Sequence, residues 1–299
     1  MAMKATKHSS GLGSPNVDWS RNIEAFCSST CYSFNCADRR HAIVRVKLRD
    51  NRGILMSGQV YNSGFFLSQK DGSLAAARAV LPFVVDVLRP HSVVDVGCGV
   101  GTWAAAASQL GVPKILGLDG DYVDRSQLLI PQSCFRAVDL GRVDETHDYG
   151  KFDLAISLEV AEHIDRSRAE PFVRFVANLA PTIMFGAAIP GQGGTNHVNE
   201  AWPSYWIDLF ARVGYEVRDV LRPQIWSDVT IPYWYRQNSF LFVKKGCQLE
   251  LETPKLAHDV VHPLLFERKS ELLTQALSRN RELEQQLERL AVSSKREER

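Results

Sequence analysis

The chain has 299 residues, of which 45% are hydrophobic and 23% are charged, and its formal net charge is +1. These values exclude a wholly disordered chain and allow a folded core with appended segments. The near-neutral balance gives no whole-chain attraction to nucleic acid or to a membrane surface, so neither is an expected partner. Because no apolar run approaches about 18 residues and the N-terminus lacks a continuous apolar stretch, we predict a cytoplasmic protein without a membrane-spanning helix or secretory signal.

The N-terminal part of the chain predicts little regular structure. Residues 1–22 are rich in Ser, Gly, Asn and Lys, which is typical of a disordered segment. Residues 23–72 form an N-terminal extension in which an alternating run and a following turn predict a small hairpin. Three of the six cysteines cluster in this extension and could bind zinc, but no fourth ligand follows at a suitable spacing. We therefore interpret Cys27, Cys31 and Cys36 as ordinary thiols.

Residues 73–246 alternate between short β-branched runs and helical patterns. A helix is predicted over 73–88, where Pro82 should kink it or start a new helix. Alternating strands and helices predict an α/β domain with a Rossmann-like, seven-stranded, mostly parallel sheet and helices on both faces. The predicted strands are 92–97, 114–119, 133–140, 151–158, 181–190, 215–221 and 239–245, and the further helices are 102–110, 166–180 and 205–213.

After a linker over 247–262, the composition of residues 263–299 predicts a C-terminal helix with a heptad pattern. This pattern indicates a coiled coil and therefore a homodimer, and a polar Asn280 at one core position would fix the register. The alternative is one amphipathic helix that folds back on its own domain. The core positions, two of them weak, are Phe266, Leu273, Asn280 and Leu287, with Lys269, Ala276, Leu283 and Leu290 three residues after each.

A glycine-rich loop gives the strongest chemical signal. A predicted buried strand contains Asp95 and leads directly into Gly97, Gly99 and Gly101 at alternate positions, and a helix opens after them. Glycine permits a sharp turn and a close approach of a ligand, and the helix N-terminus supplies free N–H groups. The G-x-G-x-G spacing differs from the G-x-G-x-x-G of dinucleotide sites, so a ligand other than a dinucleotide is favoured.

Acidic residues end or follow the next three strands. Asp119 ends the second strand, where an acid can hydrogen-bond a ribose diol, and Asp139 ends the third. Glu159 follows the fourth strand and begins an E-x-x-E-H stretch that continues to Glu162 and His163. The glycine loop and these three acidic positions, which we call the stations, follow one another along the chain. Together they indicate one nucleoside site at the carboxyl edge of the sheet.

Together these stations resemble class I S-adenosylmethionine-dependent methyltransferases over residues 92–243. The resemblance implies S-adenosylmethionine as the cofactor and an antiparallel last strand. It also implies contacts to the ribose and to the adenine amino group from the acids that end the second and third strands. The implied cofactor residues are Asp95, Gly97, Cys98, Gly99, Gly101, Asp119, Gly120, Asp139, Leu140 and Glu159.

Residues 189–206 read IPGQGGTNHVNEAWPSYW and are similar to a segment of bacterial methyltransferase-domain proteins, many of them associated with glycan pathways. That resemblance implies a small-molecule or glycan acceptor. The loop follows the fifth strand, at the edge where open α/β sheets bind ligands, and its glycines could admit an acceptor or allow a lid to close. A second segment, 231–238, could recognise a polar acceptor or simply close the sheet.

His197 is the leading candidate for a base that deprotonates an acceptor hydroxyl, and His163 is the second. In another interpretation, Glu159, Glu162, His163 and His197 resemble the metal constellation of small-RNA 2′-O-methyltransferases and would hold a divalent cation. Either histidine could also be structural. At the level of the whole chain, the alternative to an O-methylating enzyme is a catalytically weak scaffold that recruits partners through its C-terminal helix.

Overall fold

The structure is a computed structural model, and it describes residues 63–247, 249 and 256–297. The predicted disordered segment, the predicted hairpin and the cluster of Cys27, Cys31 and Cys36 lie outside the described residues. The described residues all belong to one compact unit, Leu55–Arg299.

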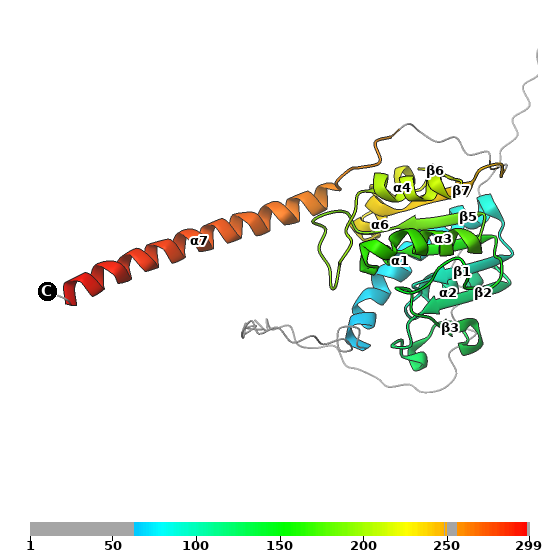
Figure 1. Ribbon diagram of the computed structural model, residues 1–299, viewed down its shortest axis with the longest axis horizontal. Coiled ribbons are helices and arrows are strands. Elements are labelled where there is room, and N and C mark those ends of the chain that lie inside the picture. Colours follow the sequence, from blue (N-terminus) through cyan, green and yellow to red (C-terminus); the bar gives the residue numbers. More distant parts are fainter. Residues whose placement is uncertain (1–62, 248, 250–255, 298–299) are drawn as a thin grey trace, which may run out of the picture. The chain divides into compact units, whose positions relative to one another are not determined.

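A single seven-stranded sheet organises the described domain (Figure 1). Its strand order is β3-β2-β1-β4-β5-β7-β6, and the first five strands of this order run parallel to one another. β7 is antiparallel to both of its neighbours, β5 and β6, which confirms the predicted mostly parallel sheet with an antiparallel last strand. The strands are β1 (Ser92–Val96), β2 (Lys114–Asp119), β3 (Phe135–Ala137), β4 (Leu154–Leu158), β5 (Thr182–Gly186), β6 (Tyr215–Arg218) and β7 (Phe240–Lys244).

The middle of the sheet is buried on both faces. Every residue of β4 and β5 is buried, as are four of the five residues of β1, which is why these segments read as continuous apolar runs. β3 lies at one edge and has only Phe135 buried. It ends at Ala137, three residues before its predicted end, because the chain leaves the sheet there to carry Asp139 and Leu140 into a loop.

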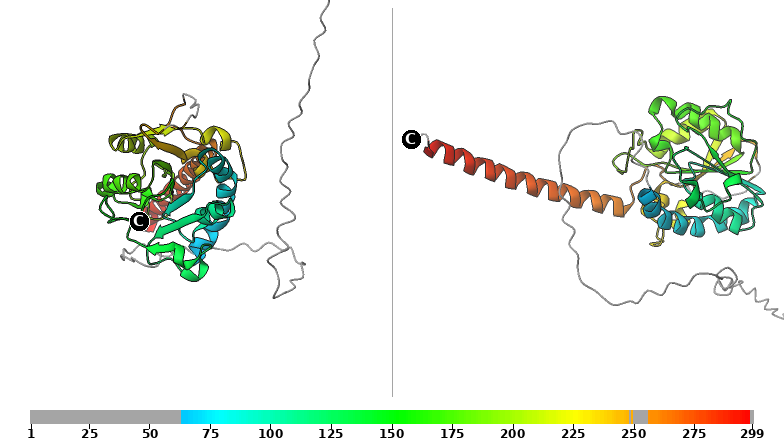
Figure 2. Two further views of the ribbon diagram at one scale, coloured as in Figure 1. Left: turned by 90° about the vertical axis from the view of Figure 1, so that its right-hand side faces the viewer. Right: turned by 90° about the horizontal axis from the view of Figure 1, so that it is seen from below.

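Helices cover both faces of the sheet (Figure 2). One core joins α1, α2 and α6 to the sheet and includes Val80, Trp103 and Tyr235, and the other joins α3 and α4 to it and includes Phe172 and Phe210. The α-helices of the domain are α1 (Ser63–Leu88), α2 (Thr102–Gln109), α3 (Ala169–Leu179), α4 (Pro203–Arg212), α5 (Arg222–Ile225) and α6 (Tyr233–Asn238). The 3-10 helices are η3 (Arg125–Gln127), η4 (Gln132–Cys134), η5 (Ala161–His163) and η6 (Arg166–Arg168).

α1 differs from the prediction at its start, and at Pro82 it continues as one helix rather than starting a new one. It begins ten residues before the predicted start at residue 73, so the expected boundary after residue 72 falls inside a helix. Pro82 lies within α1 without ending it. Pro82 and Arg78 are both exposed, so water can bond the Arg78 carbonyl that loses its helical donor. The segment 231–238 also turned out to contain a helix, α6, which begins directly after Pro232.

α7 (Pro263–Glu297) begins at the predicted residue. His262 and Leu265 are buried at its start, whereas the side chains of residues 266–289 are all exposed. The described side chains of α7 therefore do not fold back along the domain. Among the described residues, no helix is both long and apolar enough to cross a bilayer.

Candidate cofactor and acceptor site

A cavity of about 1080 Å³ opens at the carboxyl ends of β1, β2 and β4. The glycine loop, Asp119 and the start of the β3 exit loop line one part of it. Glu162, His163 and His197 line another part, together with aromatic residues of α6 and the first turns of α7. The structure thus brings together the predicted cofactor stations and the predicted catalytic residues in one chamber.

The glycine loop has a backbone that only glycine adopts easily. Gly97, Gly99 and Gly101 have φ angles of 81°, 55° and 83°, in the left-handed region that disfavours other residues. A Cβ atom on Gly97 would lie 2.2 Å from Val160, and one on Gly101 would lie 2.9 Å from Ile130. Packing against these two side chains therefore requires glycine at both positions, before any ligand is considered.

Asp119 ties this loop to the end of β2. Its carboxylate accepts hydrogen bonds from the backbone N–H groups of Gly99 and Gly120, both at 2.6 Å, and from the hydroxyl of Tyr122. Burial raises the pKa of Asp119, while these three hydrogen bonds partly offset that rise. The side chain is only 4% exposed yet lines the cavity, so it is placed to meet a ligand that enters from that side.

Asp95 and Asp139 have contrasting surroundings. Asp95 is buried and accepts a hydrogen bond from the backbone N–H of Ala104 in α2. Burial raises its pKa to about 7, and the charge of Asp119 adds to the rise. Asp139 is exposed, accepts from the N–H of Gly141 at 3.0 Å and pairs with Arg142 at 3.2 Å. Asp95 is therefore tied to the first turn of α2, whereas Asp139 is an exposed residue of the cavity lining.

Glu159 is held by two amide side chains. Gln192 donates to one carboxylate oxygen of Glu159 and Asn238 donates to the other, both at 2.8 Å. Glu159 has a φ of 57°, an uncommon conformation for a residue with a side chain. Burial raises its pKa to about 7, although the two amide hydrogen bonds counteract this. The sequence showed both amides within motifs but gave no sign that they meet at this carboxylate.

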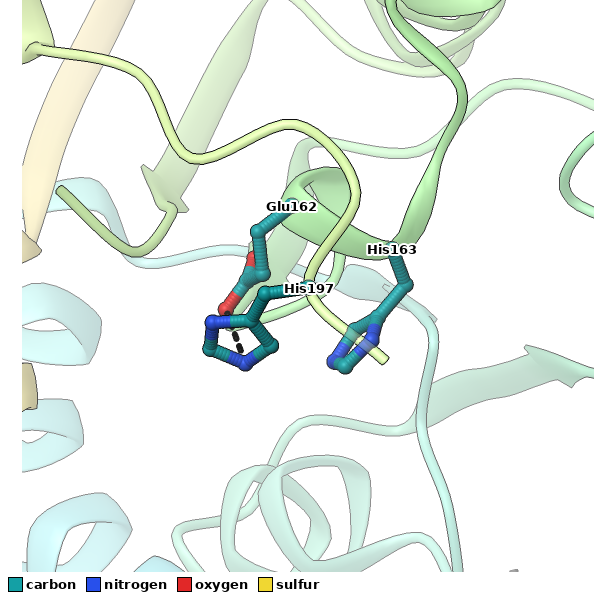
Figure 3. A group of neighbouring side chains, drawn as sticks. All are labelled: Glu162, His163 and His197. Carbon is teal, nitrogen blue, oxygen red and sulfur yellow. Dashed lines mark ion pairs between the residues drawn. The ribbon is translucent and has the colours of Figure 1, made fainter. Parts of the chain in front are cut away.

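Glu162, His163 and His197 form a compact cluster, the Glu-His-His cluster (Figure 3). One ligand atom from each residue lies within 4.8 Å of the others. Glu162 is fully buried, and neither of its carboxylate oxygens makes a hydrogen bond of ordinary geometry. Burial, with the charge of Glu159, raises its pKa well above the usual range. A buried carboxylate in this state is stabilised by a proton or by a cation.

Hydrogen bonds assign the protonated nitrogen of each histidine ring. Nδ1 of His163 lies 3.2 Å from the carbonyl oxygen of Asn196, which can only accept. Nδ1 of His197 lies 3.0 Å from the carboxylate of Glu200. Burial alone would raise the pKa of Glu200, but hydrogen bonds from His197, Gly193 and Gly191 outweigh it and lower this pKa. Each neutral ring therefore carries its proton on Nδ1 and its lone pair on Nε2.

The two rings differ in their electrostatic surroundings. Burial, followed by the charge of His197, lowers the pKa of His163 to about 4, so His163 is neutral at physiological pH.

Nε2 of His197 lies 3.9 Å from Oε1 of Glu162. A Cβ atom on Gly194 would lie 2.2 Å from this same Nε2. The loop that carries His197 therefore needs glycine at residue 194 to give the imidazole its place.

Three of the four residues that the sequence suggested as metal ligands lie together. In the part of the chain that the structure describes, the group with metal-ligating geometry contains Glu162, His163 and His197 but not Glu159. Both carboxylate oxygens of Glu159 instead accept hydrogen bonds, one from Gln192 and one from Asn238. The remaining three residues offer one carboxylate and two imidazoles.

Comparison with known proteins gives a family match and several similar structures. Residues 68–182 match the family model described as a methyltransferase domain. An O-methyltransferase family protein from Burkholderia thailandensis is 14% identical, with a TM-score of 0.45, over 60% of this chain and 57% of that one. A putative O-methyltransferase from Nostoc punctiforme PCC 73102 is 16% identical, with a TM-score of 0.41, over 60% of this chain and 58% of that one. The chain thus spans a little over half the length of these two proteins.

Magnesium protoporphyrin IX methyltransferase from Synechocystis PCC 6803, solved with bound SAH, is 18% identical, with a TM-score of 0.42, over 63% of this chain and 90% of that one. No curated protein is a significant match to the sequence. The family match falls on α1 to β5 and includes the glycine loop, Asp119 and the Glu159–His163 stretch. The match assigns a methyltransferase domain to residues 68–182, and the sheet order with the antiparallel β7 gives the Rossmann-like fold that the sequence predicted.

Proposed function

We propose that the chain methylates the oxygen of a hydroxyl acceptor, which is a small molecule or a glycan. One observation carries the proposal: the Glu-His-His cluster, with a basic imidazole nitrogen on each ring, lines the same cavity as the glycine loop and Asp119. An oxygen acceptor must lose a proton during transfer, and a group able to take that proton must lie beside the transferable methyl. An acceptor in this cavity can satisfy both conditions.

On this proposal, one part of the cavity holds the cofactor. Asp119 accepts hydrogen bonds from the ribose hydroxyls, the loop of Gly97 and Gly99 faces the methionine part, and Asp139 with Leu140 borders the adenine. S-adenosylmethionine supplies an electrophilic methyl group on a sulfonium. Glu159, fixed by its two amide partners, borders the cofactor between these residues and the Glu-His-His cluster.

His197 takes the acceptor proton. Its Nδ1–H is bonded to the ionised Glu200, which orients the ring and stabilises the imidazolium that forms. Nε2 would take the hydroxyl proton, and the acceptor oxygen would take the methyl group that the sulfonium releases when its carbon–sulfur bond breaks to leave a neutral thioether. His163 stays neutral throughout, because its pKa is about 4, and its ring contacts that of His197 edge to face at 4.9 Å between centroids.

A divalent cation at the Glu-His-His cluster is the second candidate mechanism, and the buried carboxylate of Glu162, which accepts no hydrogen bond of ordinary geometry, favours it. Two neutral imidazoles and one carboxylate suit first-row divalent metals, and both rings donate Nδ1–H to an oxygen, as metal-ligating histidines do. Such a cation would lower the pKa of an acceptor hydroxyl. Glu162, His163 and His197 would hold it, and the residues present fit that role.

The test is turnover, measured as release of S-adenosylhomocysteine from a panel of hydroxylated small molecules and sugars. His197→Ala should lower turnover about 10²–10⁴-fold, whereas the control His147→Ala, outside the cavity, should not. If a metal is used, EDTA should reproduce the loss and added Mn²⁺ should restore activity. If His197 acts alone, EDTA should have no effect. A stable His197→Ala protein with wild-type turnover would contradict both mechanisms, and cofactor binding without any turnover would favour the scaffold alternative.

A further inference from the structure

We infer that the acceptor carries an anionic group, a carboxylate or a phosphate, and that Arg268 and Lys269 at the start of α7 bind it. The inference deepens the proposed function and rests on it. It assigns the first turns of the C-terminal helix to acceptor recognition, whereas the sequence indicated only a coiled coil there.

The charges that line the cavity are distributed unevenly. Arg268 and Lys269 are the two Lys or Arg side chains among its described lining residues. Acids line the cavity as well. Asp95, Asp119, Asp121 and Asp139 lie in the part formed by β1, β2 and the loops after β2 and β3, and Glu159 and Glu162 lie after β4, where burial raises the pKa of both glutamates. Within the described part of the chain, neither Arg268 nor Lys269 forms an ion pair with an acidic side chain. Two cations without an acidic partner therefore face the chamber.

The start of α7 is fixed in place by buried contacts. The backbone N–H of His262 donates to Oε1 of Gln237 at 2.7 Å, and Gln237 in turn donates to Gln192 and Asn238. Leu265 is only 3% exposed. Arg268 and Lys269 come one helical turn after Leu265. Their position on the cavity wall therefore depends on Gln237, which is hydrogen-bonded to the two amides that hold Glu159.

The loop opposite leaves room for Lys269. Its Nζ lies 3.2 Å from the position that a Cβ atom on Gly193 would occupy, and Gly193 has a φ of 74°. Gly193 is four residues before His197, on the loop that provides the proposed base. The ammonium group is therefore on the acceptor side of the chamber. Arg268 lies beside Tyr233, where its charge opposes the rise that burial causes in the pKa of that phenol.

A cation in a partly enclosed cavity gains most from an anion that it can hydrogen-bond directly. An acceptor with a carboxylate or phosphate would place that group on Arg268 and Lys269 and its hydroxyl toward His197. The competing occupant is the carboxylate of the cofactor's methionine part. Replacing Arg268 and Lys269 should weaken cofactor binding only if they hold the cofactor's carboxylate. Measuring cofactor affinity in the same experiment therefore separates the two possibilities.

The experiment is calorimetric binding to the full chain saturated with S-adenosylhomocysteine, so that no turnover occurs. The probes are two matched pairs: 3,4-dihydroxybenzoate with 3,4-dihydroxybenzamide, and glucose 6-phosphate with glucose. At least one anionic probe should bind about tenfold or more tightly than its neutral twin, and which pair responds distinguishes carboxylate from phosphate. The double variant Arg268→Gln/Lys269→Gln should remove that preference, whereas Arg281→Gln, farther along α7, should preserve it.

The affinity for S-adenosylhomocysteine should stay within about twofold in the double variant. A comparable loss of S-adenosylhomocysteine affinity would show that the pair holds the cofactor, and would overturn the inference. Equal binding of anionic and neutral twins to the wild-type chain would also overturn it, as would a preference that survives in the double variant. Because the readout is binding, a failure of methyl transfer in the turnover assay is a separate result that concerns the proposed function alone.

Discussion

Replacing Asp119 tests the proposed cofactor contact, and the structure decides which replacement is informative. The carboxylate accepts from two backbone N–H groups, those of Gly99 and Gly120, and from the Tyr122 hydroxyl. Asp119→Ala would leave both buried N–H groups without an acceptor, at about 1–3 kcal/mol each, and would disturb the glycine loop. Asp119→Asn keeps one oxygen and so leaves only one of these donors unsatisfied. The asparagine variant therefore separates ligand binding from folding.

In Asp119→Asn, the ribose diol would lose hydrogen bonds to a charged acceptor, each worth about 1.5–3 kcal/mol. The dissociation constant for S-adenosylhomocysteine should therefore rise at least about tenfold, while the free energy of unfolding in urea should fall by about 1–3 kcal/mol. Asp121→Asn, at an exposed neighbouring carboxylate that also lines the cavity, is the matched control and should bind normally. A folded Asp119→Asn protein with unchanged affinity would refute the assignment of the ribose to this residue.

Two further predictions concern stability and assembly. The pKa of Asp95 rises from 3.8 to about 7 on folding, so the folded state holds its proton more tightly and stability should fall as pH rises from about 4 through 7. In the wild type, the free energy of unfolding measured in urea should decline between pH 5 and pH 8. In Asp95→Asn this decline should be smaller by on the order of 2–4 kcal/mol. Equal declines in the two proteins would show that Asp95 titrates normally. Deleting residues 279–299 should convert a dimer into a monomer in light scattering at tens of micromolar without changing cofactor affinity, and a full-length chain that is already monomeric there would contradict the coiled coil.

The parts of the fold that the sequence predicted well are those in which one physical requirement dominates. β1, β4 and β5 are buried on both faces, so their apolar runs have no competing interpretation. The start of α7 is marked by Pro263, which is favourable in the first turn of a helix. By contrast, α1 begins within a stretch of mixed composition and continues through Pro82. Local propensity alone would end the helix at this proline, but packing and solvent exposure allow it to continue.

The sequence predicted many of the residues that line the cavity, but it did not predict their contacts. Sequence spacing brought the cofactor stations to one edge, because the carboxyl ends of parallel strands meet there. It could not show that Gln192 and Asn238, 46 residues apart, converge on Glu159 and hydrogen-bond both of its carboxylate oxygens. Nor could it show that Gly97 and Gly101 are required by Val160 and Ile130. Both facts depend on long-range packing that a local pattern does not encode.

The heptad pattern of α7 has one unusual feature, a lysine at a core position, which the structure explains. Lys269 falls at a core position of the expected seam, where an apolar residue is typical. In the structure Lys269 lines the cavity together with Arg268 and Leu272, whereas Leu273 is 61% exposed. A charged residue at that position fits a helix whose first turns contact its own domain and whose later turns contact a partner helix. A coiled coil formed by two copies should begin after Leu272, span fewer than three heptads and be weak accordingly, and it should leave Lys269 facing the acceptor in each chain.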